Sequence, residues 1–382
     1  MITEDCLAEV CQAAEKHARQ ADLDARFPEA VLDAMRQTGL LGLMVPAEFG
    51  GGGGTLTDLA DATIRLGRVD MSVAMIFAMH CQQVVTLAKY ASEQLRAQVL
   101  PAIAAGQVYI ASVTTEAGKG GSLLMSESPS ELADGTLRID REAPMVTGGL
   151  HADGFLITMQ TPGATSPTQV DLVYAARHQL TLETRGDWQP LGMRATESVP
   201  MHISGQVPDW QVVGEPGTFR AIATQVFAPV AHIGWAAAWL GTAAGAYSRV
   251  IKHARSDAGR RQFDPSSQLV LLRLASPRAR LDVVHALLKH AICVVHGQQD
   301  LSAAPVQTLL NTLKIRAADE CFEAVSELLL LAGLRHGYLT QSPLCLERTL
   351  RDLRSAALNY SNDRLLLAGG SLALMDSEVR LA

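Results

Sequence analysis

The spacing of apolar residues changes twice along the chain, and this change limits the possible folds more than any other feature. Up to about residue 110, apolar residues recur at helical spacing, for example between Ala30 and Met35. Between about 111 and 215 the apolar runs become short or alternating, and Gly, Pro and Asp separate them. From about 219 onward helical spacing returns, for example between Val306 and Leu313. The order of elements is therefore helices, strands, helices.

We expect strands at 136–140, 154–158 and 170–174, and helices from Leu56 to Ala104 after a loop of five glycines at 50–54. The predicted fold is mostly α-helical with a central β-domain. Its three parts are an N-terminal helical domain at 1–111, a middle β-barrel or sandwich domain at 112–218, and a C-terminal four-helix bundle at 219–382. Architecture of this kind does not by itself give a chemistry.

Charge and cysteine content exclude several classes of function. The chain has 382 residues and a net charge of −7, and its 32 basic residues are scattered, so we expect no nucleic-acid partner. Six cysteines lie far apart and form no CxxC pair, which favours reduced thiols. The acidic start, Met1 to Asp5, does not resemble a signal peptide. We expect a cytoplasmic protein.

Two further patterns have simple structural interpretations. Val226 to Tyr247 carries no Asp, Glu, Lys or Arg, but Pro229 and several small residues interrupt it. A helix buried inside a bundle explains this segment better than a membrane span. His290, Cys293 and His296 are spaced like metal ligands, yet at that spacing they do not share one helical face. We therefore predict neither a membrane span nor a metal site.

Several sequence blocks carry chemical information together. In the first half of the chain they are Leu43–Gly51, Ser112–Ser122, Met145–Gly149 and Pro190–Thr196. In the second half they are Gly241–Ala246, Arg260–Pro265, Leu331–Tyr338 and Arg351–Arg354. Each block alone is typical of an ordinary loop or helix end. In this order they resemble the acyl-CoA dehydrogenase superfamily of flavin enzymes over nearly the whole chain, most weakly between 265 and 325.

The resemblance implies FAD as cofactor. In the family, the loop matching 112–122 lies against the flavin ring, and a Trp and a Thr at the positions of Met145 and Thr147 contact it. An Arg and a Phe at the positions of Arg260 and Phe263 serve the flavin nucleotide of a neighbouring subunit, so we expect a homodimer or homotetramer. The implied cofactor-binding residues are Thr114, Thr115, Gly121, Ser122, Met145, Thr147, Arg260, Gln262, Phe263, Leu331, Arg335, Gly337 and Asn362.

The chain departs from the family where a catalytic glutamate usually stands. After the Arg351–Arg354 block, Tyr360 occupies that position, and phenol is a poor base with a reference pKa of about 10. Some relatives place the glutamate earlier, at the position of Ala231. His232, the next residue, is the best candidate to replace the glutamate as a base, because imidazole titrates near neutral pH. The candidate catalytic residues are His232 and Tyr360, and the candidate substrate-binding residues are Arg194, His232 and Asn359.

Relatives without the glutamate are often flavin monooxygenases or N-hydroxylases. The preferred hypothesis is an FAD-dependent oxidoreductase that acts on an acyl thioester or related small metabolite, in an oxygen-using tailoring reaction of secondary metabolism. One alternative is an acyl-CoA or acyl-carrier-protein α,β-dehydrogenase with a relocated base. Another is a non-catalytic binding or scaffold protein of the same fold. Molecular oxygen and a flavin reductase or electron-transfer flavoprotein are the expected redox partners.

Overall fold

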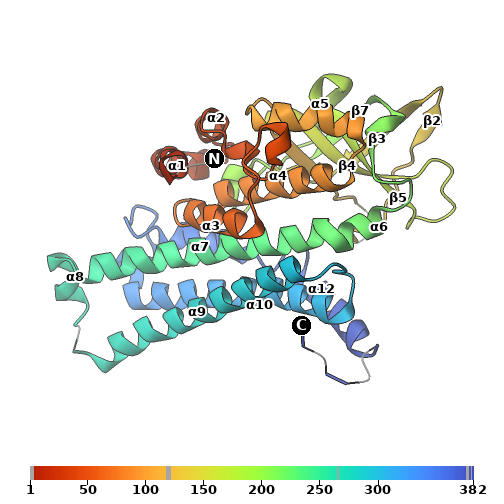
Figure 1. The fold of residues 1–382 in the computed structure, drawn as a ribbon. Helices are drawn as coiled ribbons and strands as arrows, with labels where there is room; N and C mark the ends of the chain where they lie inside the picture. The colour runs from red at the N-terminus through yellow and green to blue at the C-terminus, as the bar shows by residue number, and fades with distance from the viewer. Residues whose placement is uncertain (1–3, 118–121, 265, 376–377, 380) are drawn as a thin grey trace. The chain divides into compact units, whose positions relative to one another are not determined.

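Figure 1 shows the computed structural model, which describes residues 4–117, 122–264, 266–375, 378–379 and 381–382. The chain forms two units. Unit 1 contains residues 1–59, 76–189 and 194–231, and unit 2 contains residues 60–75, 190–193 and 232–382. The helices α3 (Leu56–Gly67), α4 (Met71–Tyr90) and α7 (Ala228–Ala254) contribute residues to both units. The three domain ranges expected from the sequence stay predictions.

In its described residues, unit 1 combines helices with two four-stranded sheets. Its helices are α1 (Glu4–Asp24), α2 (Glu29–Gln37), α5 (Glu93–Ala104), α6 (Phe219–Ile222) and most of α4. One sheet has the order β1 (Ile110–Val113), β4 (Gly154–Gln160), β5 (Val170–Ala176) and β8 (Val212–Val213). The other has the order β2 (Glu131–Ala133), β3 (Thr136–Ala143), β7 (Met201–Pro208) and β6 (Leu180–Thr184). The predicted strands at 136–140, 154–158 and 170–174 are confirmed.

The two sheets differ in burial, as their sequences indicate. In β4 six successive residues are buried, whereas β3 alternates between inward and outward positions. Alternation of this kind is typical of a sheet with one exposed face. Strand β1 pairs in parallel with β4, and every other strand pair is antiparallel. The inward positions of β3 are Leu137, Ile139, Arg141 and Ala143, so one of them is a charged residue.

The glycine loop after Phe49 packs back onto the chain that precedes it. The amide of Gly52 donates to the carbonyl of Gly42, and that of Gly54 donates to the carbonyl of Leu43. A Cβ atom at position 51 would lie 2.3 Å from the carbonyl oxygen of Val45. The two backbone segments approach closely because these positions lack side chains.

Unit 2 is helical. Besides parts of α3, α4 and α7 it contains α8 (Asp257–Gln262), α9 (Gln268–Gly297), α10 (Ala304–Gly333), α11 (Leu346–Arg354) and α12 (Asn362–Ala373). Helix α10 packs against α9, α11 and α12. A Cβ atom at Gly241 of α7 would lie 2.2 Å from the carbonyl oxygen of Ile64 in α3, so this glycine allows the two helices to touch. The mostly helical fold with a middle β-region agrees with the sequence prediction.

Among the residues that the structure describes, two helices are apolar and long enough to cross a membrane, namely α4 and the continuous helical stretch Phe219–Ala254. Their most apolar windows are 83% and 72% buried inside the protein. Core helices have the same length and composition, and this extent of burial is what a core helix shows.

Candidate functional site

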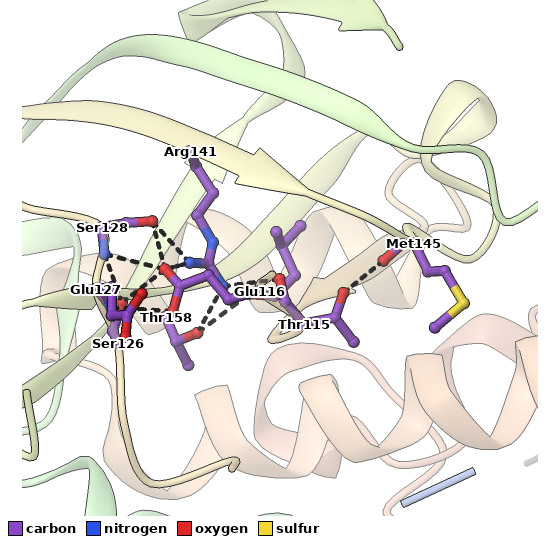
Figure 2. A network of polar contacts seen from close by, with 9 residues as sticks. Thr115, Glu116, Ser126, Glu127, Ser128, Arg141, Met145 and Thr158 are labelled. Carbon is purple, nitrogen blue, oxygen red and sulfur yellow. Dashed lines mark hydrogen bonds and ion pairs between the residues drawn. The ribbon is translucent and has the colours of Figure 1, made fainter. Parts of the chain in front are cut away.

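The loop after β1 is tied to the segment that contains Met145. The hydroxyl of Thr115 donates a hydrogen bond of 2.9 Å to the carbonyl oxygen of Met145. The side chain of Met145 is 48% exposed, and its thioether points away from the polar network (Figure 2). Two sequence blocks that were matched separately therefore meet in space.

A buried ion pair holds this loop in place (Figure 2). Arg141 on β3 is fully buried and pairs with Glu116, whose side chain is 6% exposed. Arg141 also donates to the hydroxyl of Ser128 at 2.8 Å and to the carbonyl of Thr115 at 3.0 Å. Glu116 accepts bonds of 3.0 Å from the amides of Glu127 and Ser128. Burial lowers the pKa of Arg141 to about 10, so it remains charged at neutral pH.

Thr147 lies in a second cluster of hydroxyl groups. Its Oγ1 is 3.0 Å from the hydroxyl of Ser198, which is 2.8 Å from that of Thr196. Arg194, a predicted substrate contact, donates to the carbonyl oxygens of Asp22 at 2.6 Å and Leu23 at 3.2 Å. The guanidinium group of Arg194 is thus bound to the end of α1. This geometry gives no support to its predicted role in substrate binding.

The described part of this region suits a flavin ring, which needs an apolar surface on its face and polar groups at its edge. The exposed thioether of Met145 provides polarisable surface, and the hydroxyls of Thr115 and Thr147 lie in the same two connected segments. Thr114 and Ser122 are half-buried on either side of the loop's centre. Gly121, also predicted as a flavin contact, lies outside the described residues.

In unit 2 the structure brings two of the C-terminal blocks together. Phe263 is buried and packs edge-on against His253, with ring centroids 5.8 Å apart. The ring of His253 also lies 4.7 Å from that of His336, in a π-helical turn at Leu334–Tyr338. Arg260 is exposed and donates to the carbonyl of Arg255 at 3.2 Å. The remaining predicted contacts are half-buried Leu331, exposed Arg335, buried Gly337 and Gln262, whose side chain is not described.

Neither customary position for the catalytic carboxylate carries a base suited to neutral pH. Ala231 is buried, and Tyr360 has a positive φ of 49°. Burial raises the pKa of Tyr360 above its ordinary value, and the nearby charge of Arg364 only partly offsets this effect. Asn359 is half-buried beside it. At neutral pH Tyr360 is therefore ionised even less than free phenol, so less phenolate is present to act as a base.

His232 is buried in the first part of α7, with 4% of its surface exposed. Burial, and then the positive charge of Lys314, lower its pKa to about 4, although a hydrogen bond with the backbone of Leu310 acts in the opposite direction. Among the described residues Nδ1 has no partner, so the nitrogen that bonds Leu310 is Nε2. Because a carbonyl accepts, Nε2 carries the hydrogen. Nδ1 therefore presents a lone pair on a neutral ring.

Lys314 is a buried charged residue near His232 that the sequence analysis did not identify. It is fully buried on α10 and donates to the carbonyl of Ala356 at 2.9 Å and to Oδ1 of Asn362 at 2.8 Å. Asn362 in turn donates to Asp319 at 2.9 Å, so both ends of this predicted flavin-contacting amide are bound within the chain. Burial lowers the pKa of Lys314 to about 8. Its ammonium group lies 5.5 Å from the ring centroid of Trp239.

Of the three residues with metal-like spacing, His290 bonds through Nε2 to the backbone oxygen of Ala382 at 2.9 Å. In the described ranges no group of three or more His, Cys, Asp and Glu side chains could hold a metal ion.

Comparison with known proteins agrees with the resemblance. The profile of the acyl-CoA dehydrogenase N-terminal domain matches residues 1–107, and that of the C-terminal domain matches residues 233–363. The probable acyl-CoA dehydrogenase fadE25 of Mycobacterium bovis is 25% identical over 366 residues, covering 94% of this chain and 90% of that protein. The amino sugar nitrososynthase DnmZ of Streptomyces peucetius is 26% identical, covering 93% and 88%.

Among solved structures, FMN-bound TdsC of Paenibacillus sp. A11-2 has a TM-score of 0.86 at 22% identity, covering 97% of this chain and 96% of that one. TdsC of this organism is named as a dibenzothiophene monooxygenase. At this identity the likeness shows the fold. Because the two domain profiles together match more than half of the chain, this chain belongs to the acyl-CoA dehydrogenase superfamily of flavin enzymes.

Proposed function

We propose that this protein is a flavin-dependent, oxygen-using tailoring enzyme rather than an ordinary acyl-CoA dehydrogenase. The observation that carries this proposal is that neither customary position holds a carboxylate, and that the nearest substitute, His232, is a weak base. Relative to free imidazole, its lowered pKa disfavours protonation by about 3 kcal/mol. Loss of a suitable general base typically slows proton abstraction by about 10² to 10⁴. Insertion of oxygen needs a dry, well-positioned substrate more than such a base.

The proposed reaction places one oxygen atom of O₂ on the substrate and reduces the other to water, with two electrons and two protons. A flavin reductase would supply the electrons. When bound, FAD would supply the redox chemistry, and the Thr115 and Thr147 segments would hold it. The role of His232 is to accept a hydrogen bond from the substrate at Nδ1 while remaining neutral. Because the side chain is buried, competing water is kept from this bond.

The names of two similar proteins support this proposal. DnmZ is named as an amino sugar nitrososynthase, and TdsC, which has a similar fold, as a dibenzothiophene monooxygenase, so proteins similar to this chain are named for reactions other than α,β-dehydrogenation. The alternative is α,β-dehydrogenation of an acyl thioester, with His232 as a relocated base. The similarity to an acyl-CoA dehydrogenase over 94% of the chain favours that alternative.

Anaerobic mixing distinguishes the two reactions. The purified, flavin-loaded enzyme is mixed without oxygen with a panel of acyl thioesters, and flavin absorbance is followed. We expect no bleaching, but oxygen-dependent product formation once the flavin is reduced by a flavin reductase. Bleaching by a thioester, with an α,β-unsaturated product, would establish the dehydrogenase instead. A purified protein without a flavin spectrum would favour the scaffold alternative.

The variant H232A separates the two roles of His232. If the histidine is the α-carbon base, the variant loses thioester-dependent bleaching. In the proposed role the variant binds substrate more weakly, and uncoupled oxygen consumption rises relative to product. Undiminished turnover in H232A would remove this residue from the mechanism.

A further inference from the structure

Helix α7 carries three ring nitrogens whose hydrogen-bonding capacity is not used within the described chain. They are Nδ1 of His232, Nε1 of Trp235 and Nε1 of Trp239, and all three atoms are buried. His232 is 4% exposed and Trp239 is fully buried. Buried polar atoms in proteins nearly always have partners, because an unsatisfied donor or acceptor destabilises the fold. Three such atoms lie on one helix. A single bound molecule that serves all of them explains this better than three unrelated unsatisfied atoms.

The three side chains form a continuous row. Their spacing of i, i+3 and i+7 places them on one face of the helix. The ring centroids of His232 and Trp235 are 6.0 Å apart, and those of Trp235 and Trp239 are 6.4 Å apart. We call these three residues the ring-nitrogen row. Neighbouring rings of the row therefore lie within the length of one small molecule.

The chemistry of the row is fixed by its surroundings. Because Nε2 of His232 donates to Leu310, Nδ1 can only accept. Indole nitrogens can only donate, so Trp235 and Trp239 present two donors. The ammonium group of Lys314 lies over the ring of Trp239 and already bonds two oxygens of the chain. The row thus offers one acceptor followed by two donors.

We propose that the ring-nitrogen row recognises the substrate of the proposed function. The substrate is a neutral molecule that carries an N–H or O–H donor close to an oxygen acceptor, as in an amide, a lactam or a hydroxylated neutral amine. A cationic substrate is disfavoured by the buried charge of Lys314. A carboxylate is disfavoured at His232, because its oxygens would face the lone pair of Nδ1.

Binding can be tested without turnover by NMR of the indole N–H groups. The flavin-loaded protein, labelled with ¹⁵N-tryptophan, is titrated with 2-pyrrolidinone and separately with N-methyl-2-pyrrolidinone, both through the millimolar range. The four tryptophan signals are assigned with Trp→Phe variants. We expect saturable shifts of the Trp235 and Trp239 signals with 2-pyrrolidinone. Its N-methyl analogue should bind about tenfold or more weakly, because it has no donor for Nδ1.

Three variants locate the contacts. W235F keeps the aromatic ring but removes one donor, and H232L removes the acceptor; both should weaken 2-pyrrolidinone binding by about fivefold or more. W210F, in unit 1, is the matched control and should leave binding unchanged. Equal affinity for the two lactams, or no saturable shift at Trp235 and Trp239, would overturn the proposal, as expected if only buried water serves these atoms. If the protein binds the lactam but forms no oxygen-dependent product, the proposed function is refuted, whereas the proposal for the ring-nitrogen row is not.

Discussion

Lys314 and Asn362 are joined by a hydrogen bond of 2.8 Å from a fully buried ammonium group to an amide oxygen. The second acceptor of Lys314, the carbonyl of Ala356, belongs to the same segment. This segment contains Tyr360, at the position where the family resemblance predicts a catalytic glutamate. A buried cation bound to two neutral oxygens thus fixes this segment of the chain. Burial, and after it the charge of Lys314, lowers the pKa of His232 and keeps it uncharged at neutral pH.

The first prediction concerns stability at alkaline pH. The pKa of Lys314 is lowered from 10.5 to about 8 in the folded protein. Below pH 8 both states carry the proton, and the cost of burying the charge is fully present. Between pH 8 and 10.5 the folded protein releases a proton that the unfolded chain retains, so the free energy of unfolding rises with pH. Urea denaturation should show a rise of up to about 3 kcal/mol in wild type that K314M lacks. The same pH slope in both proteins would contradict the assignment.

The second prediction tests the ion pair between Arg141 and Glu116, which holds the loop after β1. R141M leaves the carboxylate of Glu116 buried without its partner, and should lower the free energy of unfolding by about 3 to 5 kcal/mol. It should also weaken flavin retention, because Arg141 bonds the carbonyl of Thr115. R138M is the matched control on the same strand. The pair of Arg138 with Glu131 is exposed, so this change should cost less than about 1 kcal/mol. Similar losses in the two variants would disprove the special role of Arg141.

A third prediction follows from the neutral state of His232. Its pKa of about 4 means that the imidazole does not titrate between pH 5.5 and about 8. The pH profile of kcat/KM should therefore show no ionisation near 6.5 that depends on this residue. H232N keeps an acceptor near the position of Nδ1 but cannot be protonated in this range, and its profile should have the same shape as wild type. If kcat/KM of the wild type changes with an ionisation near pH 6.5, and this change disappears in H232N, His232 acts as an ordinary base.

Met145 provides a fourth prediction. Its side chain is half-exposed, and the contact with Thr115 uses only its backbone oxygen, so M145W should fold normally. A tryptophan there supplies the aromatic surface that the family resemblance implies at this position. Ring stacking contributes about 0.5 to 1.5 kcal/mol, so the Kd for FAD should fall by about two- to tenfold, measured by flavin fluorescence. L132W places a tryptophan at a different exposed apolar position and should have no effect. Unchanged flavin affinity in M145W would remove position 145 from the flavin site.

The parts of the structure that follow local patterns could be predicted from the sequence. The expected strand at 136–140 is the start of β3, and the expected helical region from Leu56 to Ala104 contains α3, α4 and α5. In both cases the spacing of apolar residues reflects burial of one face, which a single sequence records directly. Thr115 and Thr147 were predicted as flavin contacts from the family resemblance, and this assignment stays a prediction.

The charged residues inside the protein could not be found in the same way. Arg141 occupies an inward position of an alternating strand, and Lys314 lies among the buried residues Leu310, Leu313 and Ala317 of α10. Each interrupts an apolar pattern, and this interruption is the only local sign in the sequence that a charged residue is buried there. Their partners, such as Glu116 and Asn362, are distant in sequence and depend on how elements pack. A single sequence carries no direct information on that packing.

The last prediction tests the close packing of α7 and α3 in unit 2. A Cβ atom at position 241 would lie 2.2 Å from the backbone oxygen of Ile64, and backbone cannot move aside as a flexible side chain can. G241A should therefore separate the two helices and destabilise the protein by about 1 to 3 kcal/mol. G370A in α12 is the matched control, since nothing lies within 4 Å of its added methyl group. There alanine should stabilise the helix by about 0.5 to 1 kcal/mol, because it restricts the unfolded chain. Thermal unfolding of the two variants should move in opposite directions, and a stabilised G241A would show that α7 and α3 are not in contact at this glycine.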